Sequence, residues 1–224
     1  GTLRAMSASL TASARAWLAA NNELRQSVAG RLTEPLPGRP PSFCIGCPER
    51  PVFSALKLAQ QEVGPVHIAA DIGCHACGTF EPFSSGHSIL GYGMSLASRA
   101  GVSPMMSRRV LSIMGDGGFW HNGLLTGVQS ALFNQDDAVL LIFKNGYTSA
   151  TGTQEIISTP DEDARANAPD KQQSLAHKNQ TIEQTLRGMG VGWMRTVHTY
   201  RVDQMRRTLT EAFTTKYSGL KVII

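Results

Sequence analysis

Hydrophobic residues along the chain occur in blocks that alternate between the spacing of strands and that of helices. The clearest block, from Ala138 to Phe143, is continuously apolar, which is typical of a strand buried on both faces of a parallel sheet. Before it, the apolar residues between Phe119 and Phe133 follow helical spacing and form one stripe. This alternation predicts an α/β fold, a parallel sheet with helices on both faces and therefore three layers.

The same patterns predict the other elements. We expect further strands at 66–70, 110–114 and 193–197 and from Leu220 onward, and further helices at 51–63, at 91–100, from Thr181 to about Gly188 and around 205–213. Thr181 and Gln184 form a capping box, which fixes the start of their helix. The polar stretch 158–178 is expected to be a mobile or functional loop.

A proline-rich stretch, Pro35 to Pro41, separates these elements from the start of the chain. We expect residues 1–40 to form an N-terminal helix, which stops near Gly30, and a linker. Residues 41–224 are then expected to form the main domain. Because the chain starts at Gly1 and ends within an apolar run, we expect it to be part of a longer protein.

Composition excludes several classes of protein. Apolar residues make up 42% and charged residues 17% of the 224 residues, so the chain can form a core and is not disordered as a whole. The formal charge of +4 is spread along the chain, so we expect no nucleic-acid partner. No apolar run is long enough to span a membrane and no signal peptide opens the sequence, so we expect a cytoplasmic protein with no membrane partner.

A glycine-rich segment with one acidic residue follows the predicted strand 110–114. In Gly115-Asp116-Gly117-Gly118 the glycines let a ligand approach the backbone, and the helix beyond them favours an anion. An Asp there would repel phosphate unless a cation such as Mg²⁺ lay between them. Asn145 follows the next strand and so reaches the same sheet edge. The alternative is a tight turn without a ligand.

The four cysteines form two C-x₂-C pairs, Cys44 with Cys47 and Cys74 with Cys77. Without a secretory signal, disulfides are not expected. The spacing alone favours a four-cysteine zinc site first and an Fe–S cluster second. Four unrelated buried thiols are the third interpretation.

The Gly-Asp-Gly triplet followed one crossover later by Asn resembles the diphosphate–Mg²⁺ motif of thiamine-diphosphate enzymes. The resemblance implies three Mg²⁺ ligands, which are the side chains of Asp116 and Asn145 and the carbonyl of Tyr147. It places four further residues around the diphosphate: Gly117, Gly118, Thr148 and Ser149.

Two cysteine-bearing segments indicate a more specific family. Segments 40–50 and 70–74 look like those of the 2-oxoacid:ferredoxin oxidoreductases, most of all the α subunit of the indolepyruvate enzymes. Cys44, Cys47 and Cys74 fall on positions that ligate a 4Fe–4S cluster in that family. Cys77 is not at a usual ligand position, so either it substitutes for the fourth ligand or the cluster site in this chain is incomplete. The resemblance also places these residues near the cofactor: Gly46, Ile72, Gly73, Cys74, His75, Leu90, Tyr92 and Gly115.

The resemblance implies oxidative decarboxylation of a 2-oxoacid to an acyl-CoA, with electrons passed to a ferredoxin-like acceptor. In relatives the Glu that activates the coenzyme comes from a separate pyrimidine-binding domain or subunit. Glutamates are present here, but none lies in a motif of that kind: Glu49, Glu62, Glu81 and Glu155. We therefore expect a half-site within an oligomer. His121 is a candidate catalytic residue, or alternatively a surface or packing histidine.

Two other functions compete with this one. Another thiamine-dependent decarboxylase or synthase shares the Gly-Asp-Gly and Asn pattern, but the cysteine segments argue against it. The second is a zinc-stabilised α/β interaction module with purely structural cysteines. A nicotinamide dehydrogenase is disfavoured because no complete G-x-G-x-x-G follows the first strand.

Overall fold

The computed structural model describes residues 12–31, 38, 41–159 and 180–224. The chain divides into two units, residues 1–40 and residues 41–224. In the first unit, helix α2 (Ala12–Arg31) has no buried residue. The expected N-terminal helix is therefore present and ends one residue after Gly30, whereas most of the proline-rich stretch lies outside the described residues.

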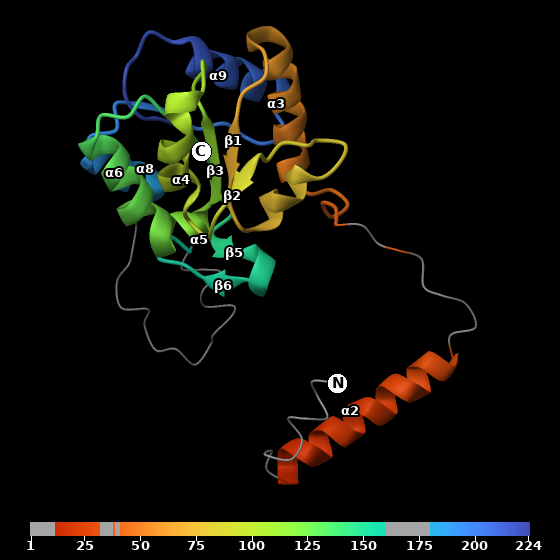
Figure 1. The fold of residues 1–224 in the computed structure, drawn as a ribbon. Coiled ribbons are helices and arrows are strands. Elements are labelled where there is room, and N and C mark those ends of the chain that lie inside the picture. The colour runs from red at the N-terminus through yellow and green to blue at the C-terminus, as the bar shows by residue number, and fades with distance from the viewer. Residues whose placement is uncertain (1–11, 32–37, 39–40, 160–179) are drawn as a thin grey trace. The chain divides into compact units, whose positions relative to one another are not determined.

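The second unit is built on a six-stranded parallel sheet with the strand order β2-β1-β3-β4-β8-β7 (Figure 1). Its strands are β1 (Ile68–Ala70), β2 (Ser88–Ile89), β3 (Leu111–Gly115), β4 (Val139–Phe143), β7 (Trp193–Arg195) and β8 (Lys221–Ile223). All five neighbouring pairs are parallel, as expected. A small antiparallel pair, β5 (Tyr147–Thr148) and β6 (Gln154–Glu155), follows β4.

Helices cover both faces of the sheet, which confirms the three-layer α/β prediction (Figure 1). One face packs against α3 (Glu49–Val63) and α9 (Val202–Thr214), and the other against α4 (Ser95–Val102), α6 (Gln129–Phe133) and α8 (Ile182–Gly188). Along β4 the side chains alternate between the two cores: Leu141 and Phe143 face α3 and α9, whereas Leu140 and Ile142 face the opposite layer. Both faces of β4 are thus buried, as its apolar run predicts.

The helix after β3 differs from the prediction at its start. It begins at Asp116 as α5 (Asp116–Gly118), continues as the π-helical stretch η4 (Phe119–Val128) and ends as α6. The Gly-Asp-Gly segment is therefore the first turn of the helix and not a loop before it. The glycines inside η4 permit this packing, because a Cβ on Gly123 would lie 2.7 Å from the sulfur of Met114.

The remaining expectations are met with shifted boundaries. The capping box is present, with the Gln184 N–H donating to Thr181 Oγ1 at 3.1 Å. The short 3₁₀ helices, which the patterns do not predict, are η2 (Cys74–Thr79), η3 (Ser103–Met105) and η5 (Ser149–Thr151). The predicted loop 158–178 lies almost wholly outside the described residues. Within the described part, no helix is long and apolar enough to cross a membrane.

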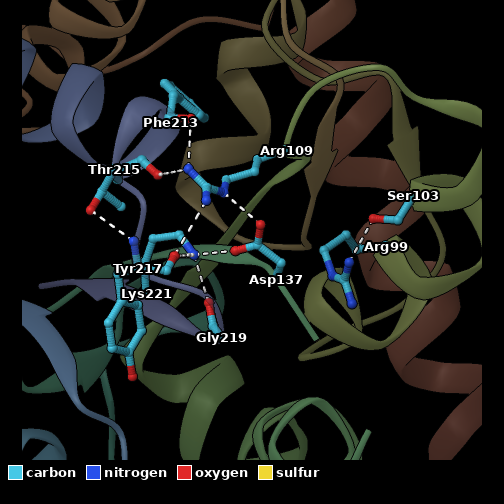
Figure 2. A network of polar contacts seen from close by, with 10 residues as sticks. Arg99, Ser103, Arg109, Asp137, Phe213, Thr215, Tyr217, Gly219 and Lys221 are labelled. Carbon is cyan, nitrogen blue, oxygen red and sulfur yellow. Dashed lines mark hydrogen bonds and ion pairs between the residues drawn. The ribbon is translucent and has the colours of Figure 1, made fainter. Parts of the chain in front are cut away.

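The amino-terminal edge of the sheet holds a buried lysine. Lys221 opens β8 with a fully buried side chain, and its ammonium group pairs with the carboxylate of Asp137 just before β4 (Figure 2). The same ammonium also donates to the carbonyls of Gly219 at 2.6 Å and Tyr217 at 3.2 Å. Burial lowers the pKa of Lys221. Burial alone would raise the pKa of Asp137, but hydrogen bonds from Lys221 and Arg109 outweigh it and lower that pKa.

Arg109 extends this network to the end of α9 (Figure 2). Its Nε donates to Asp137 at 2.9 Å and its Nη1 to the carbonyl of Phe213 at 2.8 Å. The final carbonyls of a helix lack partners within it, so the guanidinium satisfies a group that the helix leaves open. The network therefore joins β4, β8 and α9.

We predict that Asp137→Asn lowers the free energy of unfolding by about 3 kcal/mol, because it leaves the buried Lys221 ammonium without a counter-charge. In the wild type, the lowered pKa of Asp137 contributes stability that is lost below about pH 4, as this carboxylate becomes protonated. In the Asn variant this part of the decrease in stability at low pH should be absent. Denaturant unfolding across pH measures both effects.

The matched control for this prediction is Asp203→Asn, at an exposed ion pair on α9. It should lower the free energy of unfolding much less than Asp137→Asn does, because exposed ion pairs are screened by solvent. Equal losses from the two variants would contradict the special role of the buried pair.

Candidate functional site

A cavity of about 460 Å³ lies where β1, β3 and β4 end. In a parallel sheet the carboxyl ends of the strands are the usual location of a ligand site. Most of its wall comes from the residues that directly follow these strands. The lining residues are Glu49, Ile72, Gly73, Cys74, His75, Tyr92, Gly115, Asp116, Gly117, Gly118, His121, Phe143, Asn145, Tyr147, Thr148, Ser149, Ala150, Thr151 and Gln154.

Asp116 connects the ends of two neighbouring strands. Its Oδ1 accepts the N–H of Gly117 at 2.9 Å, and its Oδ2 accepts the N–H groups of Asn145 at 2.9 Å and Gly146 at 2.6 Å. Asn145 is thereby held beside the carboxylate, and its own Oδ1 accepts the N–H of Tyr147 at 3.1 Å. Burial raises the pKa of Asp116, although these backbone donors oppose the shift. Asp116 and Asn145 therefore lie side by side in the lining of the cavity.

A second group of polar atoms surrounds Gly117. A Cβ at this position would lie 2.4 Å from the hydroxyl of Tyr92 and 2.5 Å from Oγ1 of Thr148, so no side chain fits. The Thr148 Oγ1 is buried and has no hydrogen-bond partner in the described structure. The Tyr92 hydroxyl lies 3.3 Å from Nδ1 of His121, whose ring also faces the cavity. This corner offers hydroxyl groups and bare backbone, which suits an anion.

Three buried ionisable residues lie in or next to the cavity lining: Glu49 and His75 line it, and Asp71 directly precedes the lining residue Ile72. Burial lowers the pKa of His75 to about 4, so its ring is neutral near pH 7, and its Nε2 has no partner among the described residues. Burial raises the pKa of Asp71 to about 6, while this carboxylate accepts the N–H of Gly93 at 2.8 Å. Burial and the neighbouring Asp116 raise the pKa of Glu49 to about 7. Such shifts are concentrated at functional sites.

Of the four cysteines, one borders this cavity. Cys74 lines it, with its sulfur 3.5 Å from Oγ of Ser149. The loop that carries Cys44 and Cys47 turns at Gly46, which has a φ of +73°, and the Tyr200 hydroxyl donates to the Gly46 carbonyl at 2.7 Å. All four cysteines are free thiols. Sequence patterns do not predict the hydrogen bond between Tyr200 and Gly46, because Tyr200 lies far along the chain in a loop without a motif.

The comparison with known protein families indicates the class of ligand. Residues 62–224 match the family described as thiamine pyrophosphate enzyme, C-terminal TPP binding domain. The match covers more than half of the chain. The chain belongs to this family.

This thiamine pyrophosphate (thiamine diphosphate) domain has named relatives. It is 30% identical over 193 residues to the indolepyruvate oxidoreductase subunit IorA of Methanothermobacter marburgensis, covering 84% of this chain and 29% of IorA. The IorA of Methanothermobacter thermautotrophicus is 29% identical over 193 residues, with the same coverage of both chains. The chain thus spans less than a third of the length of these curated relatives.

A solved structure supports the fold of the thiamine pyrophosphate domain. The 2-oxoglutarate:ferredoxin oxidoreductase from Magnetococcus marinus superposes with a TM-score of 0.63 at 15% identity, covering 84% of this chain and 64% of that chain. At this identity the likeness concerns the fold alone. Among the interpretations left open by the sequence, the family match supports a thiamine-dependent function over a zinc-stabilised module.

The cavity brings together nearly all residues predicted to contact the cofactor. The exceptions are Gly46 and Leu90, which are not part of its lining; Leu90 is 71% exposed. Their contact with the cofactor remains a prediction. Conversely, Glu49, Phe143 and Gln154 line the cavity but were not predicted to do so. Glu49 directly follows the C-x-G-C-P segment, which was the available signal.

The residues present fit thiamine diphosphate and Mg²⁺. Asp116 and Asn145 supply side-chain oxygens, the ligand type that Mg²⁺ prefers. The unpartnered hydroxyl of Thr148 and the bare backbone of Gly117 provide donors and space for a diphosphate. The fit rests on these atoms and on the cavity that they share.

The fit for a metal at the cysteines is poorer. No group of three or more His, Cys, Asp or Glu side chains in the described ranges is arranged to hold a metal ion. Burial raises the pKa of the Cys47 and Cys77 thiols, although a metal ion deprotonates the thiols that bind it. The arrangement of the thiols in this structure therefore does not form a complete metal site.

We predict that Gly117→Ala abolishes binding of thiamine diphosphate with Mg²⁺, because the added methyl group would occupy the space between the Tyr92 and Thr148 hydroxyls. Isothermal titration calorimetry measures this loss. The control is Gly101→Ala in α4, where no atom lies within 4 Å of the new Cβ and binding should be unchanged. Normal binding by the Gly117 variant would contradict the assignment of this corner to the diphosphate.

Proposed function

We propose that this chain is the thiamine-diphosphate- and Mg²⁺-binding domain, residues 41–224, of an indolepyruvate-like 2-oxoacid:ferredoxin oxidoreductase. The whole enzyme would convert a 2-oxoacid and CoA to an acyl-CoA and pass electrons to a ferredoxin-like acceptor. The observation that carries the proposal is the meeting of Asp116 and Asn145 at one cavity wall in a chain whose relatives are IorA subunits.

Separate residues hold the two ends of the cofactor. Asp116, Asn145 and the Tyr147 carbonyl would ligate Mg²⁺. Gly117, Gly118, Thr148 and Ser149 would surround the diphosphate. The ring end would lie among the remaining lining residues, which include Ile72, Gly73, Cys74, His75 and Tyr92.

When bound, the coenzyme supplies a thiazolium ring, which serves as an electron sink for decarboxylation of a 2-oxoacid. The chain's own contribution is to anchor and orient it and to keep the wall around His75 dry. Neutral His75, stacked on Phe143 at 5.9 Å between ring centroids, adds no charge to this wall. His121 faces the open part of the cavity, where it can exchange a proton with substrate at its Nε2 while Nδ1 contacts Tyr92.

The rest of the site is proposed to come from outside this chain. A pyrimidine-binding domain or subunit would supply the activating Glu, and the active unit would be an oligomer. A 4Fe–4S cluster on Cys44, Cys47 and Cys74, with Cys77 as a substitute ligand, remains a prediction that requires the thiols to move together. Cytoplasmic location also remains a prediction.

We predict that thiamine diphosphate binds this chain only with Mg²⁺ and that Asp116→Asn weakens this binding by about tenfold or more, because it removes the charge at the predicted metal ligand. Calorimetric titration with and without Mg²⁺ measures both. Asp203→Asn, an exposed variant, should bind as the wild type does. Binding that is independent of Mg²⁺ and of Asp116 would refute the metal-anchored site.

We also predict that the isolated chain shows no 2-oxoacid-dependent dye reduction even when it binds the coenzyme, because it lacks the activating Glu of the partner domain. A redox-dye assay with several 2-oxoacids and CoA tests this. Sustained turnover by this chain alone would show that the half-site interpretation is wrong.

A further inference from the structure

Glu49 is a buried acid whose charge the described structure does not balance. It is the first residue of α3, its side chain lines the cavity, and the residue is 8% exposed. Its Oε2 is buried without a hydrogen-bond partner, and no ion pair with a described residue involves this side chain. Asp116, by contrast, accepts three backbone N–H groups.

An unpaired carboxylate in such a position is costly, because burial removes the water that would stabilise its charge. The charge that acts on Glu49 most strongly is another carboxylate, that of Asp116. Neither Lys nor Arg occurs among the residues that line the cavity. The described wall therefore carries two acids and no cation, which favours a ligand that brings positive charge at two places.

The position of Glu49 indicates which part of the ligand it faces. Glu49 lines the cavity together with Asp116, at the proposed diphosphate end, and with Cys74 and His75, at the end proposed for the rings. Along thiamine diphosphate, the thiazolium ring follows the diphosphate and carries a permanent positive charge. A residue next to the diphosphate anchor but outside it is thus placed for this ring.

We propose that Glu49 supplies the counter-charge for the thiazolium ring of the bound coenzyme. The proposal rests on the proposed function, because it presupposes the diphosphate anchor at Asp116. Glu49 is then a cofactor-contact residue, and it is unpaired in the free chain because its partner is the ligand that completes the site.

The test compares thiamine diphosphate with 3-deazathiamine diphosphate, whose ring has the same shape but no charge. Calorimetric titration of the 224-residue chain with each compound and Mg²⁺ gives the ratio of the two dissociation constants. We expect Glu49→Gln to shift this ratio by about tenfold in favour of the neutral analogue, as for the loss of a close charge pair. Glu49→Asp should shift it less, and Glu81→Gln, at an exposed Glu that bonds Ser84, should leave it unchanged.

Thermal unfolding of the ligand-free chain provides a second readout. At pH 8, above the pKa of about 7 that burial gives Glu49, the substitution Glu49→Gln removes an unbalanced buried charge, so we expect the Tm to rise by about 2 °C or more. A structural role for Glu49 predicts the opposite, since loss of a stabilising partner lowers the Tm.

The outcomes separate this proposal from the proposed function. If wild type binds both compounds but the ratio is the same in Glu49→Gln, or if the variant's Tm falls, the role of Glu49 is overturned while the coenzyme site stands. If wild type binds neither compound, the proposed function fails and this proposal fails with it. A shifted ratio together with a raised Tm supports the proposal.

Discussion

The site depends on one carboxylate that joins two strand ends through backbone hydrogen bonds. Asp116 begins the helix after β3, and it accepts N–H groups from its own helix and from the segment after β4. β3 and β4 are parallel neighbours paired up to Gly115 and Phe143, so this link joins the segments that follow the two strands. The positions of Asn145 and of the β5 residues that follow it depend on this link. Loss of the link would separate the proposed metal ligands even if the sheet remained intact.

Much of the fold could be predicted from the sequence, because the burial of apolar residues largely determines it. β4 illustrates this: its apolar run matches two covered faces, and both of its faces are buried. The Thr181 capping box was equally visible, since its two hydrogen bonds are local. The two-residue strands of the β5–β6 pair were not, because they carry no period that a pattern can reveal.

The residues of the candidate site also differ in whether they could be predicted from the sequence. Asp116 and Asn145 could be predicted from their positions after neighbouring strands, since topology alone brings them together. Tyr200 could not, because its role depends on a contact between segments distant in sequence. For Glu49 the preceding C-x-G-C-P segment was a signal, but its burial in the cavity wall could not be predicted. The start of the helix at Asp116 was also missed: its glycines suggest a loop, but close packing around them requires the absence of side chains.

A buried charged residue is paired at one edge of the sheet, whereas another is unpaired at the opposite edge. At the amino edge, Lys221 is fully buried and balanced by Asp137 and two carbonyls (Figure 2). At the carboxyl edge, Glu49 is almost as deeply buried but has no described partner. The buried charge with a purely structural role, that of Lys221, is therefore paired. The unpaired carboxylate of Glu49 in the cavity wall is then best explained by a ligand, because a ligand of opposite charge offsets the unfavourable burial when it binds.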